Sequence, residues 1–200
     1  MTSVITLLGS PVDSICLIHK ALRDHGAMVA AAAERAGADS IIQAFRCAFD
    51  SWSSGLLYFF EQEHVLMSQV LSESEEPGGG SNDQIWAAGL AHDVRREMVE
   101  ANGREQMEPT GMMEELLTVL NEGIQRTSLI QLTKQHLCQR VLSLRLALDD
   151  HLEDFETFVL LFLRRTMSEA RQREVVRRLL NDEESSDPRW VMNWVAQTLA

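Results

Sequence analysis

The chain has 200 residues and a formal net charge of −12, from 18 Lys and Arg against 30 Asp and Glu. This acidic balance repels phosphate backbones, so the composition argues against a nucleic-acid partner. Apolar residues make up 45% of the sequence and proline occupies only four positions, which allows a buried core and is unlike a disordered tail. The length fits one domain, and we predict a single domain over residues 1–200.

Nothing in the sequence predicts a signal peptide or a membrane partner. The N-terminus lacks the basic stretch of a secretory signal, and no apolar run approaches the roughly 18 residues of a membrane helix. Cys16, Cys47 and Cys138 lie in apolar helical runs without CxxC spacing, so we expect reduced, buried thiols. These features predict an intracellular protein of the cytoplasm or nucleus.

The first predicted helix covers about residues 11–36. Ser10 and Asp13 have the spacing of a capping box, and Pro11 stands at the first helical position. Residues that can face a core then recur at steps of three and four, and His19 lies on this stripe. The stripe consists of Ile15, His19, Leu22, Gly26, Val29 and Ala33.

A second helix is predicted over residues 39–72, followed by a linker near 73–83 that is rich in Gly, Ser and acidic residues. Its stripe again advances by three or four residues at each step, and Glu63 is the only polar member. The stripe consists of Ile42, Phe45, Phe49, Trp52, Leu56, Phe59, Glu63, Leu66 and Val70.

The rest of the chain predicts a third helix at 82–102, a linker near 103–111 and a long helix at about 126–165. The stripe of the long helix is Leu137, Val141, Leu144, Leu148, His151, Phe155, Phe158 and Phe162. Short helices are expected near 169–180 and 188–199. Four long helices with short links predict an all-α, up-down four-helix bundle, with the two short C-terminal helices across one end.

Four residues that can bind metal fall on or beside the apolar stripes of four different helices: His19, Glu63, His92 and His151. A lone core histidine is more often a packing residue with a satisfied hydrogen bond. Glu63 is different, because an unpaired buried carboxylate costs about several kcal/mol and needs a cation, either a metal ion or Arg96. Imidazoles and carboxylates that converge from four helices are the usual way in which a bundle holds non-haem iron or manganese.

The remaining acids and histidines are weaker candidates. Glu156, five residues after His151, is either a second carboxylate ligand or a solvated acid. His25 points to another side of the first helix than His19, so we expect it in solvent. His64 is either a core residue or a ligand in a shifted register.

The sequence also resembles a known family. The stretch from Ser10-Pro11 to His19-Lys20-Ala21-Leu22-Arg23 resembles the opening helix of hemerythrin-like (HHE cation-binding) domains, most closely those of the plant and algal BRUTUS-type iron-sensing E3 ubiquitin ligases. The tail, with Ser168-Glu169-Ala170-Arg171-Gln172 and Trp190-Val191-Met192-Asn193-Trp194-Val195, is similar to the ending of those domains. The likeness covers nearly the whole chain apart from residues 103–111.

Members of that family bind two irons through histidines and carboxylates from four helices. The resemblance implies that His19, His92 and His151 stand at ligand positions, with Glu156 at the carboxylate position that follows. The family has a pair of acids on the fourth helix, and in this sequence Phe155 stands at the position of one of them.

The second helix departs from the family's His-x-x-x-Glu pattern. Counted without a gap, the two positions hold Tyr58 and Gln62; shifted by one, they hold Phe59 and Glu63. The histidine is missing in both registers. On the third helix, Arg96 stands where the family offers a second ligand. The departures predict a degenerate site, with one ion, a poorly occupied pair of ions, or no metal and Arg96 paired to an acid.

The resemblance implies an iron-binding regulatory or sensor domain, one module of an iron-responsive E3 ubiquitin ligase whose other domains are its partners. The clustered Cys and His of a RING region do not occur in this sequence, so we expect no catalysis by this chain itself. Two alternatives stay open: a free-standing di-iron oxygen-binding or oxidase protein, and a metal-free scaffold domain.

We expect fewer than two irons per chain after anaerobic reconstitution with ferrous iron, measured by elemental analysis. A guanidinium group stays protonated and cannot coordinate, so Arg96 opposes a second ion. Replacing it (Arg96→His or Arg96→Glu) should raise the iron content, because each change removes the repulsion and supplies a ligand. Two tightly bound irons in the unchanged protein, with an oxo-bridge absorption band, would contradict a degenerate site.

Overall fold

A computed structural model describes residues 9–35, 39–72, 111–112, 118 and 130–200. Over these residues the chain is mostly helical and contains no strand, which confirms the all-α prediction. The predicted third helix at 82–102 lies outside the described residues. So do the linker near 73–83 and, except for its last residue, the linker near 103–111.

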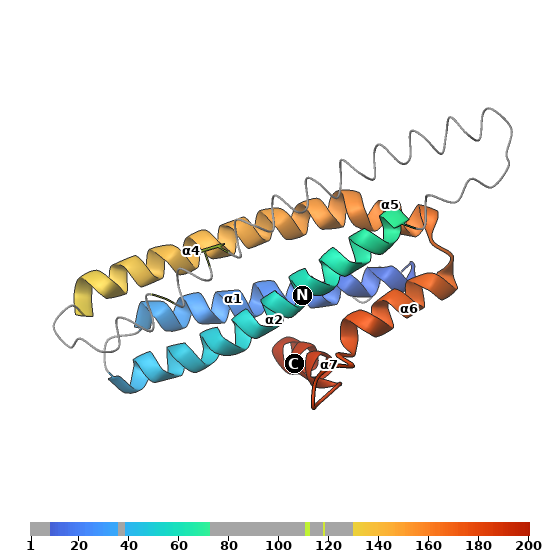
Figure 1. Ribbon diagram of the computed structural model, residues 1–200. Coiled ribbons are helices and arrows are strands. Elements are labelled where there is room, and N and C mark those ends of the chain that lie inside the picture. The colour runs from blue at the N-terminus through green and yellow to red at the C-terminus, as the bar shows by residue number, and fades with distance from the viewer. Residues whose placement is uncertain (1–8, 36–38, 73–110, 113–117, 119–129) are drawn as a thin grey trace, which may run out of the picture.

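Three long helices form the body of the described structure (Figure 1). They are α1 (Ile15–Arg35), α2 (Asp39–Ser72) and α4 (Ile130–Asp154), close to the predicted limits where those can be compared. α1 packs against both α2 and α4 and runs antiparallel to both, while α2 and α4 share a direction (Figure 1). No helix in the described part of the chain is long and apolar enough to cross a membrane.

The predicted capping box opens the first helix. Pro11–Ser14 form a short 3-10 helix, η2, in which the Asp13 carboxylate accepts hydrogen bonds from the backbone N–H groups of Gly9 at 2.9 Å and Ser10 at 3.0 Å. The Ser10 hydroxyl donates to Gln172, and Arg164 donates to the Asp13 carboxylate. The start of the chain is therefore tied to segments more than 150 residues away in sequence.

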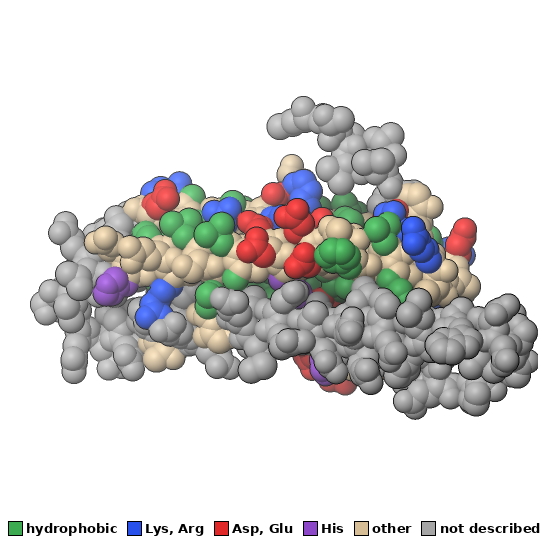
Figure 2. Space-filling model, turned by 90° about the horizontal axis from the view of Figure 1, so that it is seen from above, with side chains coloured by type: hydrophobic (Ala, Val, Ile, Leu, Met, Phe, Trp, Pro, Cys, Tyr) green, Lys and Arg blue, Asp and Glu red, His purple; other side chains and the backbone are tan. Residues whose placement is uncertain are grey.

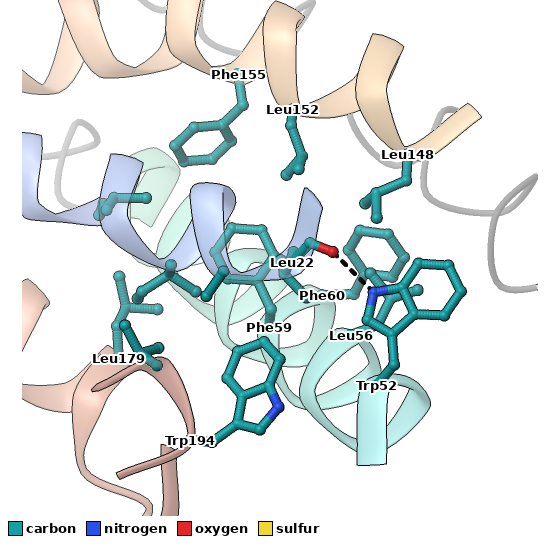
Figure 3. Packing of buried hydrophobic residues seen from close by; sticks show 14 of the residues in the cluster. Leu22, Trp52, Leu56, Phe59, Phe60, Leu148, Leu152, Phe155, Leu179 and Trp194 are labelled. Carbon is teal, nitrogen blue, oxygen red and sulfur yellow. Dashed lines mark hydrogen bonds between the residues drawn. The ribbon is translucent and has the colours of Figure 1, made fainter. Parts of the chain in front are cut away.

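The apolar stripes predicted for α1 and α2 are buried as expected. Every predicted stripe residue of α1 is buried, and so are those of α2 from Phe45 to Leu66. The side chains of Ile42 and Val70 lie outside the described residues. Trp52 joins the two helices, because its indole N–H donates to the carbonyl oxygen of Leu22 at 2.9 Å (Figure 3).

The fourth predicted helix is regular only as far as Asp154. A π-helix, η3 (Phe155–Val159), follows α4, and α5 (Leu160–Thr166) continues from it. The prediction of Phe158 on the buried stripe was wrong: Phe158 is 60% exposed, while Val159 is 5% exposed. A π-helix takes more residues per turn than an α-helix, so the buried position moves one residue along the chain.

The two short C-terminal helices are α6 (Glu169–Leu180) and α7 (Trp190–Leu199), close to the predicted ranges. α6 packs against η2, and α7 packs mainly against α1. His25, expected in solvent, is buried instead, because Trp194 of α7 covers it and donates to its Nδ1 at 3.0 Å. The sequence pattern of α1 alone contained no sign of this covering helix.

The three cysteines are free thiols, but they are not all buried. Cys16 and Cys138 are partly buried, whereas Cys47 is exposed. It lies two residues from both Phe45 and Phe49, on the opposite side of α2 from the apolar stripe. The expectation of a buried thiol was therefore wrong at Cys47.

The surface of α4 mixes two kinds of side chain. Asp150, Glu153 and Asp154 are exposed on it, as are Leu142 and Leu146. Figure 2 shows the molecule of Figure 1 from above, with acidic and apolar groups side by side on this face. The two histidines of α4 differ in exposure: His151 is only 2% exposed, whereas His136 is exposed.

Gly26→Ala should destabilise the protein by about 1–3 kcal/mol, although alanine favours helix more than glycine does. An added Cβ would lie 2.8 Å from Cζ2 of Trp52. Trp52 is fully buried and held by its bond to Leu22, so its ring cannot move aside. Urea unfolding would measure the loss. Gly111→Ala is the matched control, since its Cβ would meet nothing within 4 Å.

Candidate functional site

Four of the five predicted metal ligands belong to the described residues, and they come from different elements. His19 lies on α1, Glu63 on α2, His151 on α4 and Glu156 in η3. His92, the fifth, lies outside the described residues, as does Arg96. The four are arranged as two separate acid–histidine pairs.

The first pair joins α2 to α4. Nε2 of His151 lies 2.9 Å from Oε2 of Glu63, and the two side chains are almost fully buried, with 2% and 1% of each residue exposed. The sequence left open whether Gln62 or Glu63 faces inward; Glu63 does, and Gln62 is only partly buried. The partner that this buried carboxylate requires is, within the described structure, an imidazole.

The second pair joins α1 to η3 and includes a residue that the sequence reasoning missed. Nδ1 of His19 lies 2.8 Å from Oε1 of Glu156, and Nη1 of Arg23 lies 2.7 Å from the same oxygen. Arg23 also pairs with Asp149 at 3.5 Å. Its position one turn after His19, on the same face of α1, is the signal that could have revealed it.

The pKa shifts of this pair fix its protonation. Burial acts to raise the pKa of Glu156, but the hydrogen bonds from His19 and Arg23 outweigh it and lower the pKa below its ordinary value. Burial lowers the pKa of His19, against the opposing effect of the bond to Glu156. At neutral pH an ionised Glu156 therefore faces a neutral imidazole, whose proton must sit on Nδ1 to make the bond.

This tautomer leaves a lone pair on Nε2 of His19. In the described structure neither Nε2 of His19 nor Oε1 of Glu63 has a hydrogen-bond partner, and both atoms are buried. A buried polar atom without a partner costs about 1–3 kcal/mol. The Glu63 charge acts to raise the pKa of His19, against the larger effect of burial. The core thus contains two buried electron-pair donors that no described residue uses.

Aromatic rings enclose these donors. Phe59 and Phe155 meet the His19 ring edge to face, with centroid distances of 5.0 Å and 5.3 Å. Phe60 meets the His151 ring in the same way at 5.2 Å. Figure 3 shows Phe59, Phe60 and Phe155 together between the helices. These rings are apolar and supply no metal ligand.

The described residues fit a metal ion only in part. No group of three or more His, Cys, Asp or Glu side chains within them is placed to hold one. His19 Nε2 and Glu63 Oε1 are suitable donors, nitrogen and oxygen, for iron or manganese. Glu156 instead accepts from His19 and Arg23, the position of a group that orients a histidine. A complete centre would need at least one further ligand from outside the described residues.

Glu156 also stands at an unusual point of the backbone. It is the second residue of the π-helix η3, directly after Phe155. Single π-helical turns are rare and occur often at functional sites. The irregular turn therefore coincides with the residue that contacts His19.

Comparisons with models of protein families, with curated proteins and with solved structures found no match.

His151→Leu should destabilise the protein by about 3–5 kcal/mol, because it leaves the buried Glu63 carboxylate without its partner. The double variant with Glu63→Leu should recover most of that loss, because it removes the stranded charge as well. Chemical denaturation of the wild type, both single variants and the double variant gives the coupling energy.

The exposed pair Glu169–Arg173, at 2.7 Å, is the control for this cycle. Replacing either of its members with Leu should change the unfolding free energy by about 1 kcal/mol or less. Equal coupling in the two cycles would show that burial gives the Glu63–His151 pair no special importance.

Proposed function

We propose that this chain is a metal-binding regulatory domain of the hemerythrin-like type, built as an up-down four-helix bundle. The antiparallel course of α1 and α2, with α4 parallel to α2, supports this architecture (Figure 1). An antiparallel third helix at 82–102 would complete it. Its residues His92 and Arg96 lie outside the described structure, so this element is proposed from the sequence pattern.

The observation that carries the proposal is the state of His19. Its Nδ1 is held by an ionised carboxylate, and its Nε2 lone pair is buried without a hydrogen-bond partner among the described residues. Histidines that bind metals almost always donate their second N–H to a carboxylate, a carbonyl or water, which fixes the tautomer and raises the basicity of the free nitrogen. His19 has this arrangement.

His19 and Glu63 would hold the metal ion in this proposal, with His92 as a further ligand. His151 would hold Glu63 in place, and Glu156 would orient His19. The positive charge of Arg23 on Glu156 supports this division of roles, because a carboxylate that already binds a guanidinium is a poorer partner for a second cation. The donors favour one ion over a pair.

The occupancy or the oxidation state of the iron site would change with the iron status of the cell. A sensor domain needs such a dependence. We further propose that the domain works within an iron-responsive E3 ubiquitin ligase, with other domains of that ligase as its partners. This part rests on the likeness of its first helix and its tail to BRUTUS-type ligases.

One observation favours a metal-free scaffold as the second candidate. Each predicted ligand among the described residues already has a protein partner: Glu63 has His151, and Glu156 has both His19 and Arg23. Such pairs would keep the core neutral enough to fold without an ion. A free-standing di-iron oxidase is favoured by no feature of the described residues.

Titration of the metal-free protein with ferrous iron, under anaerobic conditions, tests the proposal. We expect about one tightly bound ion per chain, and stabilisation by about 2.7 kcal/mol when free iron reaches 100 times the dissociation constant. His19→Gln and Glu63→Gln should each weaken binding at least tenfold. His136→Gln is the matched control, because His136 is an exposed histidine of α4.

Glu156→Gln separates the two roles assigned to the acids. As an orienting residue, it should weaken iron binding about 10–100-fold without changing the number of ions bound. Wild-type protein that binds no iron, and whose unfolding free energy is the same with and without it, would leave the scaffold as the function.

A further inference from the structure

His25 of α1 has partners on two other helices. It lies on α1 and is 7% exposed; the indole N–H of Trp194 on α7 donates to its Nδ1 at 3.0 Å. The two rings are stacked, with centroids 5.8 Å apart. The backbone of Ala48 on α2 is a second hydrogen-bonding partner of the ring. The imidazole therefore lies at the point where α7 meets the body of the protein.

The chemistry of these partners admits only the neutral ring. An indole N–H can donate but never accept, so Nδ1 of His25 must carry a lone pair. The single ring proton then sits on Nε2, which is the nitrogen left to donate to the Ala48 carbonyl. A second proton on Nδ1 would place two N–H donors against each other in a buried contact.

The other contacts that hold α7 are apolar and depend on close fit. Val191, Trp194 and Val195 are its buried residues. The Trp194 ring lies so close to Gly55 of α2 that an added Cβ would be 2.9 Å from its Cζ2. The N–H of Trp190 donates at 2.7 Å to Asp182, which belongs to the connection between α6 and α7 and not to α1 or α2. The bond to His25 is thus a polar tie between α7 and α1.

We propose that protonation of His25 releases α7 from the body of the protein. The protonated ring loses its hydrogen bond to Trp194, and residues 190–199 detach while α1 and α2 stay folded. The inference does not depend on metal binding, because His25 contacts neither His19 nor Glu63 in the described structure. It assigns the C-terminal helix a second, undocked position that acid populates.

Burial, and not a neighbouring charge, is the main cause of the pKa shift of His25. On α1, Lys20 pairs with Asp24, and Arg23 pairs with Glu156. On α2, Arg46 pairs with Asp50, 4.0 Å away, on either side of Ala48. From α4, the aliphatic part of Arg145 reaches the neighbouring Gly26, and α7 carries no ionisable side chain. None of these charges contributes to the pKa shift of His25, which burial lowers and the Ala48 bond opposes.

The sign of the effect follows from that direction. Docked His25 has a pKa below the ordinary histidine value of 6.5, whereas in the released state it returns towards that value. Docking is therefore fully stable above pH 6.5 and weakens as the pH falls towards the lowered pKa. Over that interval the released fraction rises by up to about tenfold per pH unit, because one proton is taken up on release.

Hydrogen exchange measured by mass spectrometry, segment by segment from pH 7.5 to 5, tests the release of α7. Protection of residues 190–199, corrected for the intrinsic exchange rate at each pH, should fall by up to about tenfold per pH unit below 6.5. Residues 45–60 of α2 should keep their protection over the same range. In NMR spectra the Trp194 indole N–H resonance should shift with the same midpoint.

Two variants make the test specific. His25→Asn keeps an acceptor near Nδ1 but does not titrate, so residues 190–199 should stay protected at every pH. Trp194→Phe keeps a ring but removes the donor, so α7 should be less protected at pH 7.5 and less sensitive to pH. His136→Asn, at an exposed histidine, should behave as the wild type does.

Three results would overturn the proposal. The first is equal loss of protection in the wild type and in His25→Asn. The second is loss in residues 190–199 and 45–60 together, which would be global acid unfolding. The third is a Trp194 indole resonance that does not change between pH 7.5 and 5. The last needs no variant, so the test stands even where a substitution prevents folding.

Discussion

A carboxylate can be buried in an apolar helical core only beside a partner that compensates its charge. Glu63 is buried in this core, so its need for a partner constrains how the described helices pack. His151 satisfies it from α4, across the core. His19 and Glu156 repeat the arrangement between α1 and η3. Apolar stripes alone would tolerate several rotations of these helices, whereas two buried polar pairs permit few. The pairs therefore set how the helices face one another, and the aromatic rings fill the space that remains.

The regular helices could be predicted from the sequence because their apolar periodicity is unambiguous. Steps of three and four on α1 and α2 identified the buried residues and favoured Glu63 over Gln62 as the inward polar residue. The same reasoning failed beyond Phe155. Residues 158–163 are all apolar, so hydrophobic pattern cannot distinguish one register from the next. Only the packing of α5 against the rest of the molecule selects Val159 over Phe158.

The burial of three candidate site residues could be predicted from the sequence, and their pairings could not. His19, Glu63 and His151 are buried as their stripes required, but which acid meets which histidine depends on distances between helices that a sequence does not contain. The spacing of Arg23 from His19 places both on one face of α1, but the contact of Arg23 with Glu156 exists only once η3 lies beside α1. His25 was misplaced for a related reason: the helix that covers it lies about 170 residues further along the chain.

The π-helix also explains how one continuous helical segment packs against two different sets of neighbours. An α-helix advances about 100° per residue, so one extra residue offsets the azimuth of everything that follows by about that angle. The buried line runs through Leu148 and His151 of α4 to Phe155 at the start of η3. It continues through Val159, the last residue of η3, to Leu163 of α5. The offset also brings Arg164 to the buried Asp13 near the start of the chain. Without this change of phase, a straight helix aligned for the histidine pairs would turn Leu163 and Arg164 away from the partners they now contact.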